Sequence, residues 1–233
     1  MTNSSGTRQF HIGHGRKSEK SVVMFYMSMF FNEHHGTNLS VFEKKKTSKR
    51  SNSLIYINSN CVEYRENAFL EIAKKLKNTD IFYGGKCNGS RGTNKGLKKE
   101  LNNIQFFNST PGGNKFEENP EIQQLFRFCL VMENSRVDGY ISEKILNAFL
   151  GGCVPIYYGT EEVFDIFNPD AFIFYNISNP NDALERLSYL EKNKTAYEKV
   201  MKTPILRNEE SYKKYFTLGW LKDEVRSMVE NVW

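Results

Sequence analysis

The stretch "FRFCLVMENSRVDGYISEKILNAFLGGCVPIYYG" (126–159) contains two apolar runs separated by a densely polar turn. Its first part, "FRFCLVME" (126–133), is rich in aromatic and branched residues and is typical of a buried strand. "SEKILNAFLGG" (142–152) predicts a helix, because Ser142 is a favoured N-cap residue and two glycines end the run. "VPIYYG" (154–159) predicts another strand. This strand–helix–strand order with short connections indicates a parallel α/β unit.

The same alternation extends to both sides of this unit. The further predicted strands are "LIYIN" (54–58), "DIFYGG" (80–85) and "AFIFYN" (171–176), and the further predicted helices are "RENAFLEIAKKLKN" (65–78), "EEVFDIF" (161–167) and "NPNDALERLSYLEKN" (179–193). The tail after residue 216 has one more long helical pattern. We therefore expect an α/β protein with a Rossmann-like parallel sheet.

Composition is that of a globular protein. The 233 residues are 39% hydrophobic and 25% charged, which is enough apolar material for a core and argues against wholesale disorder. The net charge of +5 suits an anionic small molecule, a nucleic acid or a membrane surface equally well. A nucleic-acid role would use the basic run "EKKKTSKR" (43–50), but that run lies in a predicted linker, so we expect no nucleic-acid partner.

The four cysteines stand far apart without a C-x-x-C pair, so we expect no zinc site. Cys129 and Cys153 lie in apolar runs and are interpreted as free, buried thiols, whereas a disulfide between Cys61 and Cys87 stays open. The apolar run "VVMFYMSMFF" (22–31) is half of a membrane span and lacks a signal-peptide cleavage site, so we interpret it as a core segment. These features predict a chain without a transmembrane segment or signal peptide, cytoplasmic or peripheral to a membrane.

In parallel sheets, ligands bind past the carboxyl ends of the strands, where the following helices begin. Lys144 lies in the first turn of one such helix, where it opposes the helix dipole and costs stability unless an anion is present. Arg65 begins another helix and can bind a phosphate through two hydrogen bonds. Two cations at two junctions suggest a diphosphate ligand. Neither loop is a P-loop or a G-x-G-x-x-G turn.

Residues 126–173 closely resemble the signature region of the α-1,3/1,4-fucosyltransferase family. The family pattern F-E-N-S, a spacer, Y-[IVT]-[TS]-E-K, a helix and G-x-[VI]-P-[VI]-x-x-G is present, with Met132 in place of the first Phe. Upstream, "YINSNCVEYRENAF" and "TDIFYGG" resemble the S-N-x(4–6)-R and D-x-[YF]-G-[GK] segments of that family. The resemblance covers about residues 53–216.

The resemblance implies the C-terminal half of a GT-B glycosyltransferase that binds GDP-fucose. Carried over position by position, Arg65 and Lys144 would neutralise the diphosphate, and Glu143 would bind hydroxyls of the ribose or the fucose. Tyr140 and Asn134 would shape the donor pocket. Transfer would invert the sugar through an oxocarbenium-like state, with the leaving charge stabilised by the two cations. No metal and no cofactor other than the donor substrate would be required.

The family also implies a catalytic base in an N-terminal acceptor half. Residues 1–52 are too few for a complete half and are interpreted as a tail, a linker and a remnant of the acceptor domain. Residues 53–216 would form the GDP-fucose-binding domain, and residues 217–233 a C-terminal helix. Glu33, beside two histidines, is a weak candidate for the base, although a surface loop is the simpler interpretation.

Two functions follow. One is fucose transfer from GDP-fucose to an oligosaccharide acceptor, with a second polypeptide supplying the acceptor half if this chain lacks it. The other is a non-catalytic nucleotide-sugar-binding protein without a complete acceptor domain. The sequence leaves both open.

Overall fold

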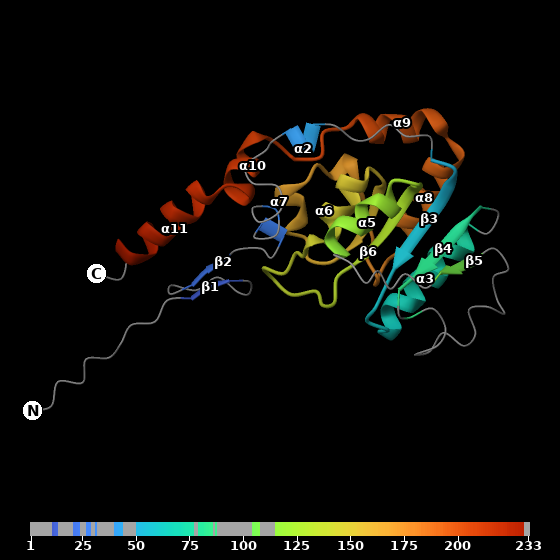
Figure 1. The fold of residues 1–233 in the computed structure, drawn as a ribbon, viewed down its shortest axis with the longest axis horizontal. Helices are drawn as coiled ribbons and strands as arrows, with labels where there is room; N and C mark the ends of the chain where they lie inside the picture. Colours follow the sequence, from blue (N-terminus) through green and yellow to red (C-terminus); the bar gives the residue numbers. More distant parts are fainter. Residues whose placement is uncertain are drawn as a thin grey trace, which may run out of the picture.

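The computed structural model describes residues 11–13, 21–23, 27–28, 31, 40–43, 50–76, 79–85, 87, 104–107 and 115–230 (Figure 1). In chain order, its described elements are β1 (His11–Gly13), β2 (Ser21–Val23), α2 (Ser40–Glu43), β3 (Asn52–Ile57), α3 (Glu63–Lys75), β4 (Ile81–Gly84), β5 (Ile104–Phe107), α5 (Lys115–Gln123), β6 (Phe126–Met132), α6 (Glu143–Gly151), β7 (Val154–Tyr158), α7 (Val163–Ile166), the 3-10 turn η2 (Pro169–Ala171), β8 (Ile173–Phe174), α8 (Asn181–Lys192), α9 (Lys194–Lys202), α10 (Glu209–Phe216) and α11 (Leu218–Glu230).

Six strands form one parallel sheet in the order β5-β4-β3-β6-β7-β8. Counted along the chain, this is the 3-2-1-4-5-6 order of the dinucleotide-binding fold. The order reverses between β3 and β6, which pair directly in the middle of the sheet. The expected Rossmann-like parallel sheet is therefore confirmed, and its ligand crevice is expected at the carboxyl ends of these two strands.

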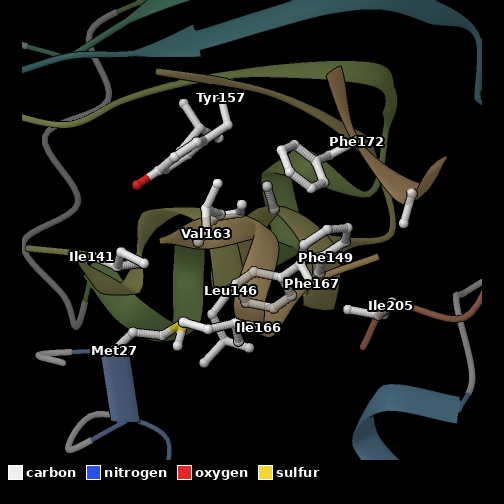
Figure 2. Packing of buried hydrophobic residues seen from close by; sticks show 14 of the residues in the cluster. Met27, Ile141, Leu146, Phe149, Tyr157, Val163, Ile166, Phe167, Phe172 and Ile205 are labelled. Carbon is white, nitrogen blue, oxygen red and sulfur yellow. The ribbon is translucent and has the colours of Figure 1, made fainter. Parts of the chain in front are cut away.

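Both faces of the sheet are buried, which explains why its strands are almost continuously apolar. Alternate residues of β3 point to opposite faces: Leu54 packs with α3, α8 and α9, whereas Ile55 packs with α6, α7 and α10. Figure 2 shows the second of these two clusters, in which Leu146 and Phe149 of α6 lie beside Phe167. The helices after β3 and β6 thus lie on opposite faces of the sheet.

The predicted signals at the ends of α6 are confirmed. Ser142 is the N-cap residue, with extended backbone angles, and its Oγ accepts from the backbone N–H of Lys144. Gly152 is the C-cap residue with φ of 77°, a left-handed conformation that favours glycine. Between these caps, the helix buries Ile145 and Leu146 against the sheet.

The described parts of the N-terminal region form structure that the sequence did not predict. Residues 11–13, in the segment expected to be a loose tail, pair in parallel with residues 21–23. Met27 and Phe31 are fully buried, which agrees with the interpretation of this run as a core segment. Phe42, from the predicted linker, is also buried and packs on Phe31 and Phe216. This aromatic cluster holds the N-terminal segment against α10.

The C-terminal tail forms the expected helix, α11, which extends away from the body of the molecule (Figure 1). It lies against β2. Among the described residues, no helix is both long enough and apolar enough to cross a membrane.

Several local predictions need correction. The helix predicted over 161–167 is shorter, and the strand predicted over 171–176 is reduced to two residues after a 3-10 turn. Several elements were not predicted: β1, β2, α2, β5, α5, α9 and α10. Helix α5 contains Pro120 and has a polar composition, so it lacks a clear apolar period.

The cysteine interpretation was wrong for one pair. Cys129 and Cys153 are joined in a disulfide, with an S–S distance of 1.94 Å and a Cα–Cα distance of 5.9 Å. Strands β6 and β7 are neighbours in the sheet, and their register pairs Cys129 with Pro155. Cys153 immediately precedes β7, close enough to Cys129 for the two to bond. The pair left open, Cys61 and Cys87, is also joined, at 2.08 Å, and connects the loop before α3 to the segment after β4.

Candidate donor-binding site

Arg65 lies in the first turn of α3, directly after the loop that leaves β3. Only 2% of the residue is exposed. Its Nε donates to the Tyr56 hydroxyl at 3.2 Å, and its Nη1 donates to Asn134 Oδ1 at 2.8 Å. A guanidinium carries five N–H donors, and the contacts within the described part of the chain use two of them. The remaining donors can bind an anion.

The start of α3 is fixed by a second buried group. Glu66 is 1% exposed, and its carboxylate accepts from Asn58 Nδ2 and from the Tyr83 hydroxyl, both at 2.7 Å. Gly85 passes so close to Asn58 that a Cβ would lie 2.2 Å from the Asn58 carbonyl oxygen. These contacts connect the first turn of α3 to the ends of β3 and β4, and so they set the position of Arg65.

Lys144 lies in the first turn of α6, and its ammonium is held by its own chain. Nζ donates to Glu133 Oε2 at 3.1 Å and to Ser142 Oγ at 2.8 Å. Glu133 is 0% exposed, and its carboxylate also accepts from Ser142 N at 2.8 Å and from Ser142 Oγ at 2.6 Å. The first-turn lysine was expected to need a nearby anion, and Glu133 is that anion.

The loop between β6 and α6 is tied down on both sides. The Tyr64 hydroxyl donates to the backbone carbonyls of Glu133, at 3.1 Å, and Asn134, at 2.9 Å. On the other side, the Gly139 N–H donates to Glu162 Oε2 at 2.6 Å. The loop is therefore held between the first turn of α3 and the segment that begins α7, which keeps Asn134 within reach of Arg65.

The other two predicted residues lie at the same edge of the sheet. Tyr140 is half-buried in the loop before α6, and Glu143 is half-buried as the first residue of that helix. Burial raises the pKa of the Glu143 carboxyl above its usual value, and the nearby Lys144 offsets part of this rise. A carboxyl that is partly dehydrated in this way gains by accepting hydrogen bonds from a ligand.

Arg65 and Lys144 line the same small cavity, of about 40 Å³, at the point where the strand order reverses. Residues from β3, β6, α5 and α6 complete its walls. The Gln123 Oε1 and Asn147 Oδ1 atoms also belong to this lining, and both are buried without a hydrogen-bond partner among the described residues. Buried acceptors of this kind are satisfied by a water molecule or a ligand. The cavity therefore combines two cations with unused polar groups.

A larger groove lies elsewhere. It has a volume of about 460 Å³ and is lined by Lys75, Tyr189 and Lys192, among others. Lys75 and Lys192 are the last residues of α3 and α8, so this groove lies at the amino ends of the strands. It contains none of the predicted donor-site residues.

The structure thus brings Arg65, Asn134 and Lys144 together and places Tyr140 and Glu143 at the same edge. Sequence reasoning missed the role of Glu133, whose only signal was an acid at the end of an apolar strand near a first-turn lysine. The weak candidate base, Glu33, lies outside the described residues.

The comparison with protein families agrees with this geometry. The family described as "Glycosyltransferase family 10 (fucosyltransferase) C-term" matches residues 47–202. The matched range is more than half of the chain and contains both strand–helix junctions of the site. The chain therefore belongs to glycosyltransferase family 10, the fucosyltransferases.

Individual relatives show how much of a longer protein this chain represents. The alpha-(1,3)-fucosyltransferase FucT of Helicobacter pylori is 34% identical over 90 residues, which are 38% of this chain and 19% of that protein. GDP-fucose protein O-fucosyltransferase 3 of Xenopus laevis is 30% identical over 163 residues, which are 68% of this chain and 32% of that protein. The chain thus spans about a fifth to a third of these curated relatives.

A crystal structure of an alpha1,3-fucosyltransferase with GDP matches with a TM-score of 0.66 at 18% identity. The match covers 95% of this chain and 69% of that one. This likeness confirms the expected fold, a Rossmann-like parallel sheet of the GT-B type.

Proposed function

We propose that this chain binds GDP-fucose in the crevice between α3 and α6 and serves as the donor-binding part of a fucosyltransferase. One observation carries the proposal: Arg65 and Lys144, from two different strand–helix junctions, line one cavity at the topological switch point. The family and the solved structures with GDP and GDP-fucose support the same donor.

In this proposal, Arg65 and Lys144 bind the diphosphate and stabilise the charge that develops on GDP as the bond to fucose breaks. The positive end of the α6 dipole adds to this effect. Glu143 accepts from ribose or fucose hydroxyls, while Asn134 and Tyr140 shape the pocket. The two protein cations take the part that a metal ion plays in other sugar transfers, so we propose that the donor needs no metal or cofactor.

The acceptor side of the reaction is also part of the proposal. An inverting transfer needs a base to deprotonate the acceptor hydroxyl. One relative is named as an alpha-(1,3)-fucosyltransferase and another as a protein O-fucosyltransferase, so the names of the relatives differ in acceptor. We propose an oligosaccharide acceptor, bound with the help of a second polypeptide if this chain alone is inactive.

The cysteines bear on the compartment. Both pairs are joined in disulfides, and these form and persist in oxidising compartments. We therefore propose an oxidising compartment rather than the cytoplasm. Mass spectrometry of the natural protein after alkylation without reduction tests this, since blocked thiols at all four positions would contradict it.

Calorimetric titration with GDP tests the donor site directly. We expect the wild-type chain to bind GDP and the Arg65→Ala, Lys144→Ala double variant to bind it far more weakly. No binding by the wild type, or equal binding by the variant, would contradict the proposal. Release of GDP from GDP-fucose, measured with and without oligosaccharide acceptors, then distinguishes a transferase from a binding protein.

A further inference from the structure

Glu133 is a buried carboxylate beside the candidate site, in contact with Lys144. It is the residue after β6, it is 0% exposed, and it accepts from three donors: the Ser142 backbone N–H, the Ser142 hydroxyl and the Lys144 ammonium. All three contacts are donated to the side chain, as the acceptor oxygens of a carboxylate require, and one of the donors is charged. Glu133 therefore contributes a negative charge next to a site that is expected to bind anions.

The contacts of Lys144 show what this charge does to the lysine. An ammonium has three donors, and the Lys144 ammonium uses one on Glu133 and one on Ser142. Lysine side chains are long and flexible, so these two contacts fix where the charge lies. The side chain of Lys144 stays 29% exposed and lines the cavity, which leaves its remaining donor for a phosphate oxygen.

The same contact also weakens the site as a receptor for anions. Arg65 and Lys144 bring two positive charges, and Glu133 offsets part of the charge of Lys144, so a diphosphate meets less positive charge than the two cations alone would supply. Glu133 lies on the side of the ammonium away from solvent, where its repulsion of a bound phosphate is poorly screened. Among the described residues, Arg65 has no comparable acid within ion-pair distance.

We propose that Glu133 is the built-in counter-ion of Lys144: it positions the ammonium in the empty site and limits how tightly the site retains a nucleoside diphosphate. The choice of GDP as that diphosphate rests on the proposed function. In a transfer reaction, the sugar leaves with the acceptor and GDP must then dissociate. A site with weaker affinity for GDP releases this product faster, so Glu133 acts as a positioning and affinity-setting residue rather than a catalytic one.

Glu133→Gln tests the proposal, because it keeps the shape of the side chain and removes the charge. We expect this variant to bind GDP about five- to tenfold more tightly than the wild type, with a slower dissociation rate. We expect GMP to gain less and guanosine, which carries no phosphate, to bind as before. A purely structural role would weaken all three ligands together.

The matched control is Glu191→Gln. Glu191 accepts from Arg127 at 2.8 Å in an ion pair that is also largely buried, and Arg127 lies at the other end of the same strand, β6. This variant should lose stability without any change in GDP affinity. Unchanged or weaker GDP binding by Glu133→Gln, or a gain that is equal for guanosine, would overturn the proposal.

A second experiment needs no ligand and keeps the proposal testable if Glu133→Gln alone does not fold. Lys144→Met leaves the buried Glu133 charge without its cation, so its thermal midpoint should fall. Adding Glu133→Gln to Lys144→Met should recover part of the loss, because the stranded charge is gone. No recovery in the double variant would show that the two side chains are not coupled and would overturn the counter-ion role.

Inorganic pyrophosphate separates this inference from the proposed function. If the wild type binds pyrophosphate but not GDP, and Glu133→Gln binds pyrophosphate more tightly, the donor assignment fails and the counter-ion role stands. If GDP binds and Glu133→Gln gives no gain, only the counter-ion role fails. If neither ligand binds, both fail.

Discussion

At the α3 junction, Arg65 is 2% exposed and donates to two neutral groups, the Tyr56 hydroxyl and the Asn134 side-chain carbonyl. At the α6 junction, Lys144 is 29% exposed and forms an ion pair with the buried Glu133. Both cations lie in the first turn of a helix that follows one of the two central strands of the sheet. The arginine keeps its full charge for a ligand, whereas the lysine shares its charge with a carboxylate of its own chain.

Two junctions of the same kind therefore have different expected roles. The α3 junction is expected to provide most of the attraction for a diphosphate, and the α6 junction is expected to couple ligand binding to the stability of its own loop. Substitutions at the two junctions should therefore differ in their effects on GDP affinity and on the free energy of unfolding.

The largest change in affinity is expected for Arg65→Met. This substitution keeps the apolar stem and removes a charged, forked donor whose hydrogen bonds to phosphate are worth about 1.5–3 kcal/mol. We expect GDP affinity, measured by calorimetry, to fall about a hundredfold. The Arg65→Lys variant should recover only part of the loss, because an ammonium lacks the fork. Full recovery by lysine would contradict a bidentate contact.

Lys144→Met should have a smaller effect on affinity and a larger effect on stability. GDP affinity should fall about tenfold, because the lost cation was already partly neutralised. The free energy of unfolding should fall by about 2 kcal/mol, since Glu133 stays buried without its partner. Urea denaturation measures this loss. If Arg65→Met destabilises the protein more than Lys144→Met does, the contrast between the two junctions is wrong.

The disulfides give a third comparison. Removing the Cys61–Cys87 disulfide by alanine substitution should cost about 3 kcal/mol of stability. It should also weaken GDP binding about threefold, because Cys61 lies in the loop that positions α3. The control is removal of Cys129–Cys153, which joins β6 to the residue before β7. That change should lower the stability but leave the GDP affinity unchanged. Equal GDP affinities in the two variants would show that the Cys61–Cys87 disulfide does not help to position α3.

Glu143→Gln should have the smallest effect. Because the folded pKa of Glu143 is raised by burial above the unfolded value of 4.5, its contribution to stability is present below that unfolded value. The contribution is lost as the pH rises through the folded pKa. The glutamine variant should therefore be slightly more stable than the wild type at neutral pH and slightly less pH-dependent, as followed by thermal melts from pH 4 to 8.

The same variant also identifies which sugar Glu143 contacts. If the carboxylate accepts from fucose hydroxyls, Glu143→Gln should weaken GDP-fucose binding and spare GDP. If it accepts from ribose, both ligands should weaken. No change for either ligand would exclude Glu143 from the site.

Much of the fold could be predicted because its signals are local. The apolar runs predicted β3, β6 and β7. The caps Ser142 and Gly152 predicted where α6 begins and ends. Elements with weak local signals were missed: α5 contains a proline and a polar surface, and β5 is only four residues long. Short elements depend on neighbouring strands and helices for their stability, so their own residues carry little information about them.

For the candidate site, the sequence alone was enough to place Arg65 and Lys144 near the start of a helix that follows a strand, because local periodicity and capping decide where helices start. The folded structure was needed to show that these two junctions line one cavity, since that follows from the strand order at the centre of the sheet. It also decided that Lys144 pairs with Glu133 and that Cys129 bonds to Cys153. Such pairings depend on the burial and register of segments that come together only when the chain folds.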